Sequence, residues 1–238
     1  MVSQITLGTI AVDVVLKEIK HVHLSVHPPT GRVRIAAPKR MSVDTIRLFA
    51  ISKLDWIKRQ QQKQRVQERE SPREYLDRES HYVWGRRYLL QVVEVEAVAS
   101  VQLQHGTLVL RLRSGTDAAT REAVVASWYR HLLKTAVPAL IAAWEPRLNV
   151  GVNGVYVQQM KTKWGSCNPT ARTIRLNTEL AKKPRECLEY IVVHEMAHCR
   201  EPTHSPRFVT LMDRVMPSWR DTRDLLNRLP ARHEQWNY

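Results

Sequence analysis

The chain has 238 residues, of which 43% are hydrophobic and 25% are charged. This composition is typical of a folded globular protein and excludes an extended disordered chain. The 37 Lys and Arg residues outnumber the 23 Asp and Glu residues, which gives a net charge of +14 and a pI near 10.1. A basic excess of this size favours polyanionic partners such as nucleic acid, although it serves solubility equally well.

The cysteines and the N-terminal residues indicate where such a chain functions. Cys167, Cys187 and Cys199 are odd in number and irregularly spaced, which argues against a disulfide framework. The N-terminal stretch has no basic start, and Asp13 interrupts its apolar residues, so it does not read as a signal peptide. No run of about 18 apolar residues occurs that could span a membrane. We therefore expect a cytoplasmic protein without a membrane segment.

The first half of the chain is predicted to be rich in β-strands. Residues 5–16 and 21–37 show rough alternation of apolar and polar residues, and "HPPTGR" at 27–32 is expected to form a hairpin turn. A helical pattern follows from 43 to about 70, and its end is polar and basic almost all round. Strands are expected again at 81–97, 100–104 and 107–113. We interpret residues 1–115 as a β-rich N-terminal region with one long basic helix at about 43–70.

Helices dominate the predicted second half. Asp117 is a good N-cap for a helix, whose apolar residues are mostly three or four positions apart. Strands are expected at 154–164 and 172–177, joined by a turn at Asn168-Pro169, and helices at about 184–200, 205–215 and 218–229. Residues 116–238 therefore form a second region, and the predicted fold class is α+β. The stripe of the first helix comprises Val124, Trp128, Leu132, Leu140, Ile141 and Trp144.

The sequence "HEMAH" at 194–198 lies in the helix expected at 184–200. Residues four apart share one face of a helix, so His194 and His198 can bind one metal ion. Glu195 points in a different direction around the helix axis, so it can reach a water on that ion without binding the ion. This is the His-Glu-x-x-His pattern of zincins, in which the Glu is the general base.

A catalytic zinc usually has three protein ligands and one open position, so a third ligand is needed. We favour His204, which follows the Glu201-Pro202 pair at the expected end of the helix. A Ser-Pro helix start comes directly after His204 and would fix its position. A carboxylate is the other possibility, and the candidates are Asp213, Asp221 and Asp224.

These parts predict peptide or amide hydrolysis. Zinc lowers the pKa of its bound water to about 7, and Glu195 would take the proton as the water attacks a carbonyl, then pass it to the leaving amine. One alternative is a basic, nucleic-acid-associated binding protein with a structural metal site. Glu195 argues against this alternative, because a structural site needs no base and normally has four ligands. The other alternative is a zincin that binds metal but is catalytically silent.

The segment "YIVVHEMAHCREPTHSPRF", preceded by "KTKWGSC" and "IRLNTELAKKP", resembles the YgjP-like zinc metallopeptidases, which are related to the SprT-like group. The resemblance covers about 155–225 and is weaker upstream, where "WGRRYLLQV" resembles a Leu-Gly-Arg-x-Tyr strand of the family. It implies a zincin-like core with an active-site helix and a small sheet. It also implies a zinc ion on His194, His198 and His204, with Glu195 as the base and a protein or peptide as the substrate.

The stretch "MKTKWGSCNP" is expected to be a strand that runs into a tight turn at Gly165. In zincins an edge strand beside the active-site helix can pair with an extended substrate. Lys163 and Trp164 are therefore candidates for lining the substrate cleft. The alternative for Trp164 is a core position beneath the helix.

Two other features have less specific explanations. His21, His23 and His27 suggest a second histidine cluster, although exposed histidines on a strand explain them better. The SprT-like resemblance suggests DNA-associated substrates, and the basic charge is compatible with that. The basic helix, however, lacks the interleaved aromatic residues that stack on bases, so the pattern favours an ordinary solvated face.

Overall fold

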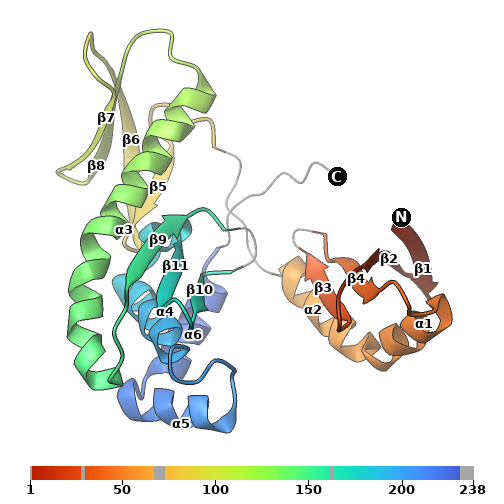
Figure 1. The fold of residues 1–238 in the computed structure, drawn as a ribbon. Helices are drawn as coiled ribbons and strands as arrows, with labels where there is room; N and C mark the ends of the chain where they lie inside the picture. Colours follow the sequence, from red (N-terminus) through yellow and green to blue (C-terminus); the bar gives the residue numbers. More distant parts are fainter. Residues whose placement is uncertain (1, 28–29, 67–72, 161–162, 231–238) are drawn as a thin grey trace. The chain divides into compact units, whose positions relative to one another are not determined.

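The computed structural model describes residues 2–27, 30–66, 73–160 and 163–230 (Figure 1). Two compact units are present, one formed by residues of the segment 1–69 and the other within 70–232. Helices and three small sheets make up these units, which confirms the predicted α+β class. In the described ranges, no helix combines the length and the apolar character that crossing a membrane requires.

The first unit is a four-stranded sheet with two helices, in the strand order β1-β2-β4-β3. β2 and β4 are parallel, and the other pairs are antiparallel. Its core joins the sheet to the helices, since Ile35, Ile46 and Ile57 are all fully buried. The elements are β1 (Val2–Leu7), β2 (Ile10–Lys17), β3 (His23–His27), β4 (Arg32–Pro38), α1 (Val43–Ser52) and α2 (Leu54–Val66).

Two elements expected in the first unit are each divided in the structure. The strand expected at 5–16 is a hairpin of β1 and β2, because Gly8, with a φ of 60°, turns the chain. The single helix expected at 43–70 is α1 followed by α2, and residues 67–70 lie outside the described residues. α1 closes at Lys53, whose backbone N–H donates to the carbonyl of Ala50. The hairpin of β3 and β4 agrees with the sequence.

The second unit begins with a sheet that has the same order and senses as the first, β5-β6-β8-β7. The strand expected at 81–97 is a hairpin here, because Trp84 and Gly85 both have positive φ, as a two-residue type I′ turn requires. The turn between β7 and β8, at His105-Gly106, likewise has positive φ at both residues. The strands are β5 (Ser80–Val83), β6 (Arg86–Glu94), β7 (Ser100–Gln104) and β8 (Thr107–Leu112).

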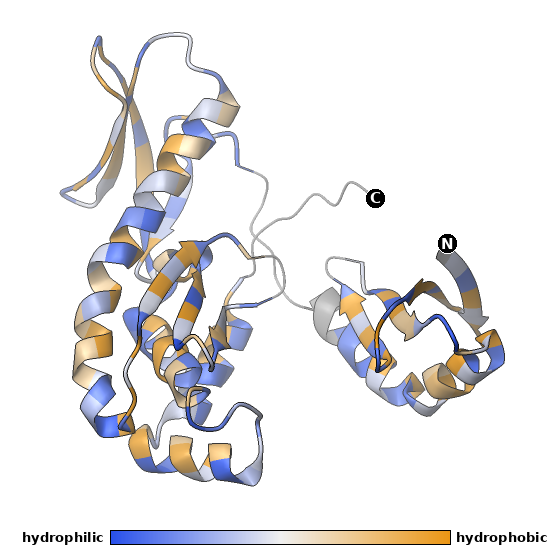
Figure 2. Ribbon diagram, viewed as in Figure 1, coloured by the Kyte–Doolittle hydropathy of each residue, from blue (hydrophilic) through white to orange (hydrophobic). Residues whose placement is uncertain are grey.

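The long helix α3 (Ala118–Leu148) begins as predicted, since Asp117 accepts a hydrogen bond from the backbone N–H of Thr120 at 2.7 Å. Hydrophobic and hydrophilic residues alternate along it (Figure 2). Most residues of the expected stripe are only partly buried and pack against the core. The fully buried stripe lies one position further along the chain from them. The buried residues are Val125, Tyr129, Leu133, Val137, Ile141, Trp144 and Leu148.

A small sheet with the order β10-β11-β9 and three further helices complete the second unit. β9 and β11 are parallel, and β10 is antiparallel to β11. Helix α4 contacts α3, β10, β11 and α6, so it lies inside the unit (Figure 1). The elements are β9 (Gly154–Gln158), β10 (Gly165–Asn168), β11 (Thr173–Asn177), the 3-10 helix η1 (Thr178–Lys182), α4 (Arg185–Ala197), α5 (Pro206–Val215) and α6 (Trp219–Arg228).

One hydrophobic core runs through the whole second unit. Leu110 of β8, Leu133 of α3 and Val192 of α4 are fully buried members of it. The boundary expected after residue 115 cuts through this core, whereas the compact units divide between residues 69 and 70. The strands β5 to β8 were grouped with the N-terminal strands by their similar patterns, but their apolar side chains pack against α3 and its neighbours.

Adjacent leucines on β6 provide a test of this core. Leu90 is 1% exposed and Leu89 is 43% exposed, because neighbouring strand residues face opposite sides. We expect Leu90→Ala to lower the free energy of unfolding by about 3 kcal/mol, through lost apolar burial and the remaining cavity. Leu89→Ala is the matched control and should cost less than about 1 kcal/mol. Urea denaturation followed by circular dichroism measures both, and equal losses would contradict the described packing.

Candidate metal centre

Helix α4 carries the "HEMAH" sequence and is buried along most of its length. Val192, Val193 and Met196 are fully buried, while His194 and His198 are half-buried at its C-terminal end. The helix ends at Ala197 rather than at residue 200, and His198 is its C-cap. His198 still has helical backbone angles, with φ −65° and ψ −17°, so it stays on the same face as His194.

The structure brings His194, His198 and His204 together. One ring nitrogen from each lies within 4.8 Å of the others, and the Nε2 atoms of His194 and His204 are 3.0 Å apart. In the described parts of the chain, this is the one group of three or more His, Cys, Asp or Glu side chains that could hold a metal ion. His21, His23 and His27 therefore form no such group.

Phe208 packs against all three histidine rings, and the sequence analysis did not identify it. Its ring centroid lies 5.0 Å from that of His194, 4.7 Å from that of His198 and 4.9 Å from that of His204. Phe208 is 1% exposed, and its backbone N–H donates to the side chain of Ser205, the N-cap of α5. The predicted Ser-Pro helix start thus places Phe208 as well as His204. An aromatic residue in the first turn of this helix was the sequence signal that could have identified Phe208.

The surroundings of His194 and His198 favour neutral rings. The Nδ1 atom of His198 is 3.0 Å from the carbonyl oxygen of Glu201, which can only accept, so Nδ1 carries the proton and Nε2 is left with a lone pair. Burial lowers the pKa of His198. Burial, with the neighbouring His198 and His204, lowers the pKa of His194 to about 3. Neutral imidazoles are the form that binds metal ions.

The carboxylates considered as third ligands have other partners or lie outside the cluster. Asp213 accepts hydrogen bonds from Nε1 of Trp219 at 2.7 Å and from Arg220. Asp224 accepts from Nε of Arg223 at 2.9 Å. Asp221 is also absent from the metal-binding group formed by the described residues. His204 is the residue that the fold places beside the histidine pair.

Glu195 is only 5% exposed, in contrast to most glutamates. Its burial raises the pKa of its carboxyl group to about 7, and the nearby positive charge of Lys163 acts in the opposite direction. A carboxyl group with a pKa in this range can accept and release a proton near neutral pH. The helix and its C-cap thus present two neutral nitrogen donors, at positions 194 and 198, and one group that can accept a proton, at position 195.

Lys163 and Trp164 lie in the connection that leads into β10. The strand expected at 154–164 ends at Gln158, and Gly165 begins β10 instead of making a turn, because it pairs with Leu176 of β11. Lys163 is exposed near Glu195. Trp164 is half-buried and packs against the core.

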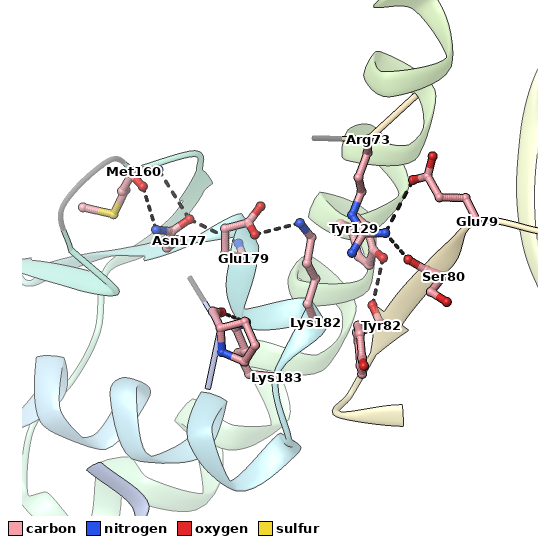
Figure 3. Close-up of polar contacts among 11 residues, drawn as sticks. Arg73, Glu79, Ser80, Tyr82, Tyr129, Met160, Asn177, Glu179, Lys182 and Lys183 are labelled. Carbon is pink, nitrogen blue, oxygen red and sulfur yellow. Dashed lines mark hydrogen bonds and ion pairs between the residues drawn. The ribbon is translucent and has the colours of Figure 1, made fainter. Parts of the chain in front are cut away.

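Asn177, at the end of β11, holds this connection in place. Its side-chain amide donates to the carbonyls of Met160 and Lys163, each at 2.8 Å (Figure 3 shows the bond to Met160). Its backbone N–H donates to the carbonyl of Trp164, also at 2.8 Å. Asn177 is part of the quoted segment "IRLNTELAKKP", but the sequence could not show which loop its side-chain amide would bind by hydrogen bonds.

Comparison with known proteins now identifies the class and then the family. Two histidines and a buried glutamate in the His-Glu-x-x-His pattern of one helix, with a third histidine close to the pair, are the arrangement of metal-dependent hydrolases. The family model described as "YgjP-like, metallopeptidase domain" matches residues 20–229. The chain belongs to the YgjP-like metallopeptidase family. No curated protein gives a significant match.

Two solved structures are similar to part of the chain. The metallopeptidase zymogen abylysin of Pyrococcus abyssi is 23% identical, with a TM-score of 0.36, and the match covers 38% of this chain and 90% of that one. The metallopeptidase zymogen jannalysin of Methanocaldococcus jannaschii is 21% identical, with a TM-score of 0.34, and the match covers 38% and 92%. The family membership rests on the family model, which covers most of the chain.

Cys167 of β10 offers a test of the packing beside α4. Burial, and contact with Cys199 at an Sγ–Sγ distance of 3.6 Å, raise the pKa of Cys167 from 9.0 to about 12. Because the thiolate is the nucleophile, Cys167 should react with iodoacetamide at pH 8 on the order of 10³-fold more slowly in the native protein than after unfolding. Peptide mass spectrometry over time measures this ratio. Equal rates in the two states would show that Cys167 is not packed as described.

Proposed function

We propose that the protein is a zinc-dependent peptidase in which His194, His198 and His204 hold the ion and Glu195 is the general base. The observation that carries the proposal is the convergence of three imidazoles, two of them on the helix that also carries the buried carboxyl group of Glu195. Membership of a metallopeptidase family supports it. The reaction is the hydrolysis of a peptide bond in a protein or peptide.

The donor set fits zinc. Zinc binds imidazole nitrogen at about 2.0–2.1 Å in tetrahedral sites, which places two ligand nitrogens about 3.3 Å apart. The Nε2 atoms of His194 and His204 are 3.0 Å apart, close to that spacing. Three nitrogen donors leave one tetrahedral position open, as a catalytic zinc site requires. The His198–Glu201 hydrogen bond fixes one ring in the orientation that such sites use.

The ion and the side chain of Glu195 would have different roles in the reaction. When bound, the ion would polarise the scissile carbonyl and acidify water. Glu195 accepts a proton from the attacking water as its oxygen bonds to the carbonyl carbon, and gives the proton to the nitrogen as the carbon–nitrogen bond breaks. Burial keeps the carboxyl group of Glu195 away from bulk solvent, so the proton stays at the reacting centre.

Strand β10 is the proposed docking edge for the substrate. It stands at one end of its sheet and, among the described strands, pairs with β11 alone. An extended peptide can add to such an edge through backbone hydrogen bonds. Lys163 and Trp164, which directly precede β10, are in a position to contact side chains of that peptide. Their role in binding remains part of the proposal.

The two alternatives receive different support. The net charge of +14 is compatible with nucleic acid but identifies no binding site for it. A catalytically silent zincin would retain the histidine cluster and lack turnover, so only an activity measurement separates it from the peptidase. The cytoplasmic location also stays a prediction.

The proposal predicts different effects for the base and for a ligand. We expect wild type and Glu195→Gln each to hold one zinc per chain, because Glu195 does not bind the ion. We expect His204→Ala to bind zinc more weakly, on the order of 10²-fold, through loss of a donor. Glu195→Gln should lower kcat/KM on casein on the order of 10²-fold or more. Elemental analysis, zinc titration and casein cleavage measure these quantities.

Asp213→Asn is the matched control, since it removes the carboxylate that was the nearest alternative in sequence. It should keep both the zinc and the activity. Full zinc affinity in His204→Ala, with loss in the Asp213 variant, would assign the third ligand to the carboxylate. Tightly bound zinc without cleavage of casein or of any member of a peptide library would support the silent zincin instead.

A further inference from the structure

One face of β10 lies along α4 and the turn that follows it, and side chains meet there at two points. Gly165 and Cys167 point to the same side of the strand, because they are two residues apart. Glu195 lies on α4, and Cys199 lies in the turn that directly follows the C-cap of α4, His198. Gly165 lies against Glu195, and Sγ of Cys167 is 3.6 Å from Sγ of Cys199. The strand is therefore seated on the helix along the side that carries the proposed base.

At the first contact there is no room for a side chain on the strand. A Cβ atom added to Gly165 would lie 2.6 Å from Oε1, 2.8 Å from Cγ and 3.0 Å from Cδ of Glu195. Real Cβ atoms essentially never come closer than 3.0 Å to another heavy atom. The φ of Gly165 is not positive, so any residue could adopt its backbone conformation. It is the space taken by Glu195 that requires glycine here.

Neither the strand nor the helix is free to move apart and make room. Gly165 is paired with Leu176 of β11, and the preceding carbonyl, that of Trp164, accepts the backbone N–H of Asn177 at 2.8 Å. On the other side, Val192 and Met196 of α4 are fully buried in the core. A methyl group at position 165 would therefore displace the side chain of Glu195, which is the most movable part of the contact.

We propose that Gly165 is a positioning residue for the reaction, since it leaves the space in which the carboxyl group of Glu195 is held for proton transfer. This inference rests on the proposed role of Glu195 as the general base. Substitution at Gly165 changes the position of the base and leaves the three histidines where they are. Substitution of Gly165 should therefore lower the rate of catalysis and leave the affinity for the metal ion unchanged.

Gly154 provides a matched control in the same sheet. It is the first residue of β9, as Gly165 is of β10, and its φ is not positive either. A Cβ atom at Gly154 would meet its nearest neighbour, Cγ2 of Thr173, at 3.6 Å, which is ordinary van der Waals contact. Gly154→Ala thus introduces the same methyl group at the start of a strand without touching Glu195.

The first test compares Gly165→Ala with Gly154→Ala in the full chain loaded with zinc. Gly165→Ala should bind one zinc with wild-type affinity and lower kcat on labelled casein on the order of 10²-fold, the scale of general-base catalysis, with KM little changed. Gly154→Ala should match wild type in zinc affinity, kcat and KM. A kcat of Gly165→Ala equal to that of wild type, in a wild type that cleaves casein, would overturn the inference.

A second test measures the contact without activity and covers the case in which Gly165→Ala is too unstable to assay. Removing the side chain of Glu195 removes the clash, so Glu195→Ala and the double variant Glu195→Ala/Gly165→Ala should melt at the same temperature. A lower melting temperature of the double variant would mean that the methyl group clashes elsewhere, which would also overturn the inference. An inactive wild type would count against the proposed peptidase, and the melting comparison would still test the contact.

Discussion

The candidate site depends on the burial of helix α4. Contacts with α3, β10, β11 and α6 cover most of this helix and leave its C-terminal end at the edge of the core. The same burial has two electrostatic results. It lowers the pKa of His194, which keeps that ring neutral, and it raises the pKa of Glu195 to about 7. The proposed metal-binding ring of His194 and the proposed proton acceptor, Glu195, thus obtain their properties from one packing arrangement.

The neighbouring elements complete the site from segments far apart in the chain. The loop between α4 and α5 returns His204 to the pair on the helix, and Phe208 of α5 packs against all three rings. Asn177 of β11 fixes the connection that carries Lys163. Helices α4 and α5 and the loop between them hold the histidines, whereas the small sheet sets the surroundings of Glu195.

Strand β10 links the proposed binding of substrate to the position of the proposed base. One of its faces meets α4 at Gly165, and its outer edge has no partner among the described strands. A peptide that paired with this edge would lie on the same strand that confines Glu195. The tight contact at Gly165 and the proposed docking edge are therefore two properties of one four-residue strand in this member of a metallopeptidase family.

The sequence by itself determined the α+β class, the family, the α-helices of the second unit and the candidate residues of the "HEMAH" motif, because these depend on spacing within one helix and on local caps such as Asp117 and Ser205. It did not determine where the compact units divide, because strands β5 to β8 have the same local pattern whichever core they join. Only the tertiary structure placed Phe208 against the imidazoles and Gly165 against Glu195. Such contacts join residues distant in sequence, and their distances follow from packing rather than from any local pattern.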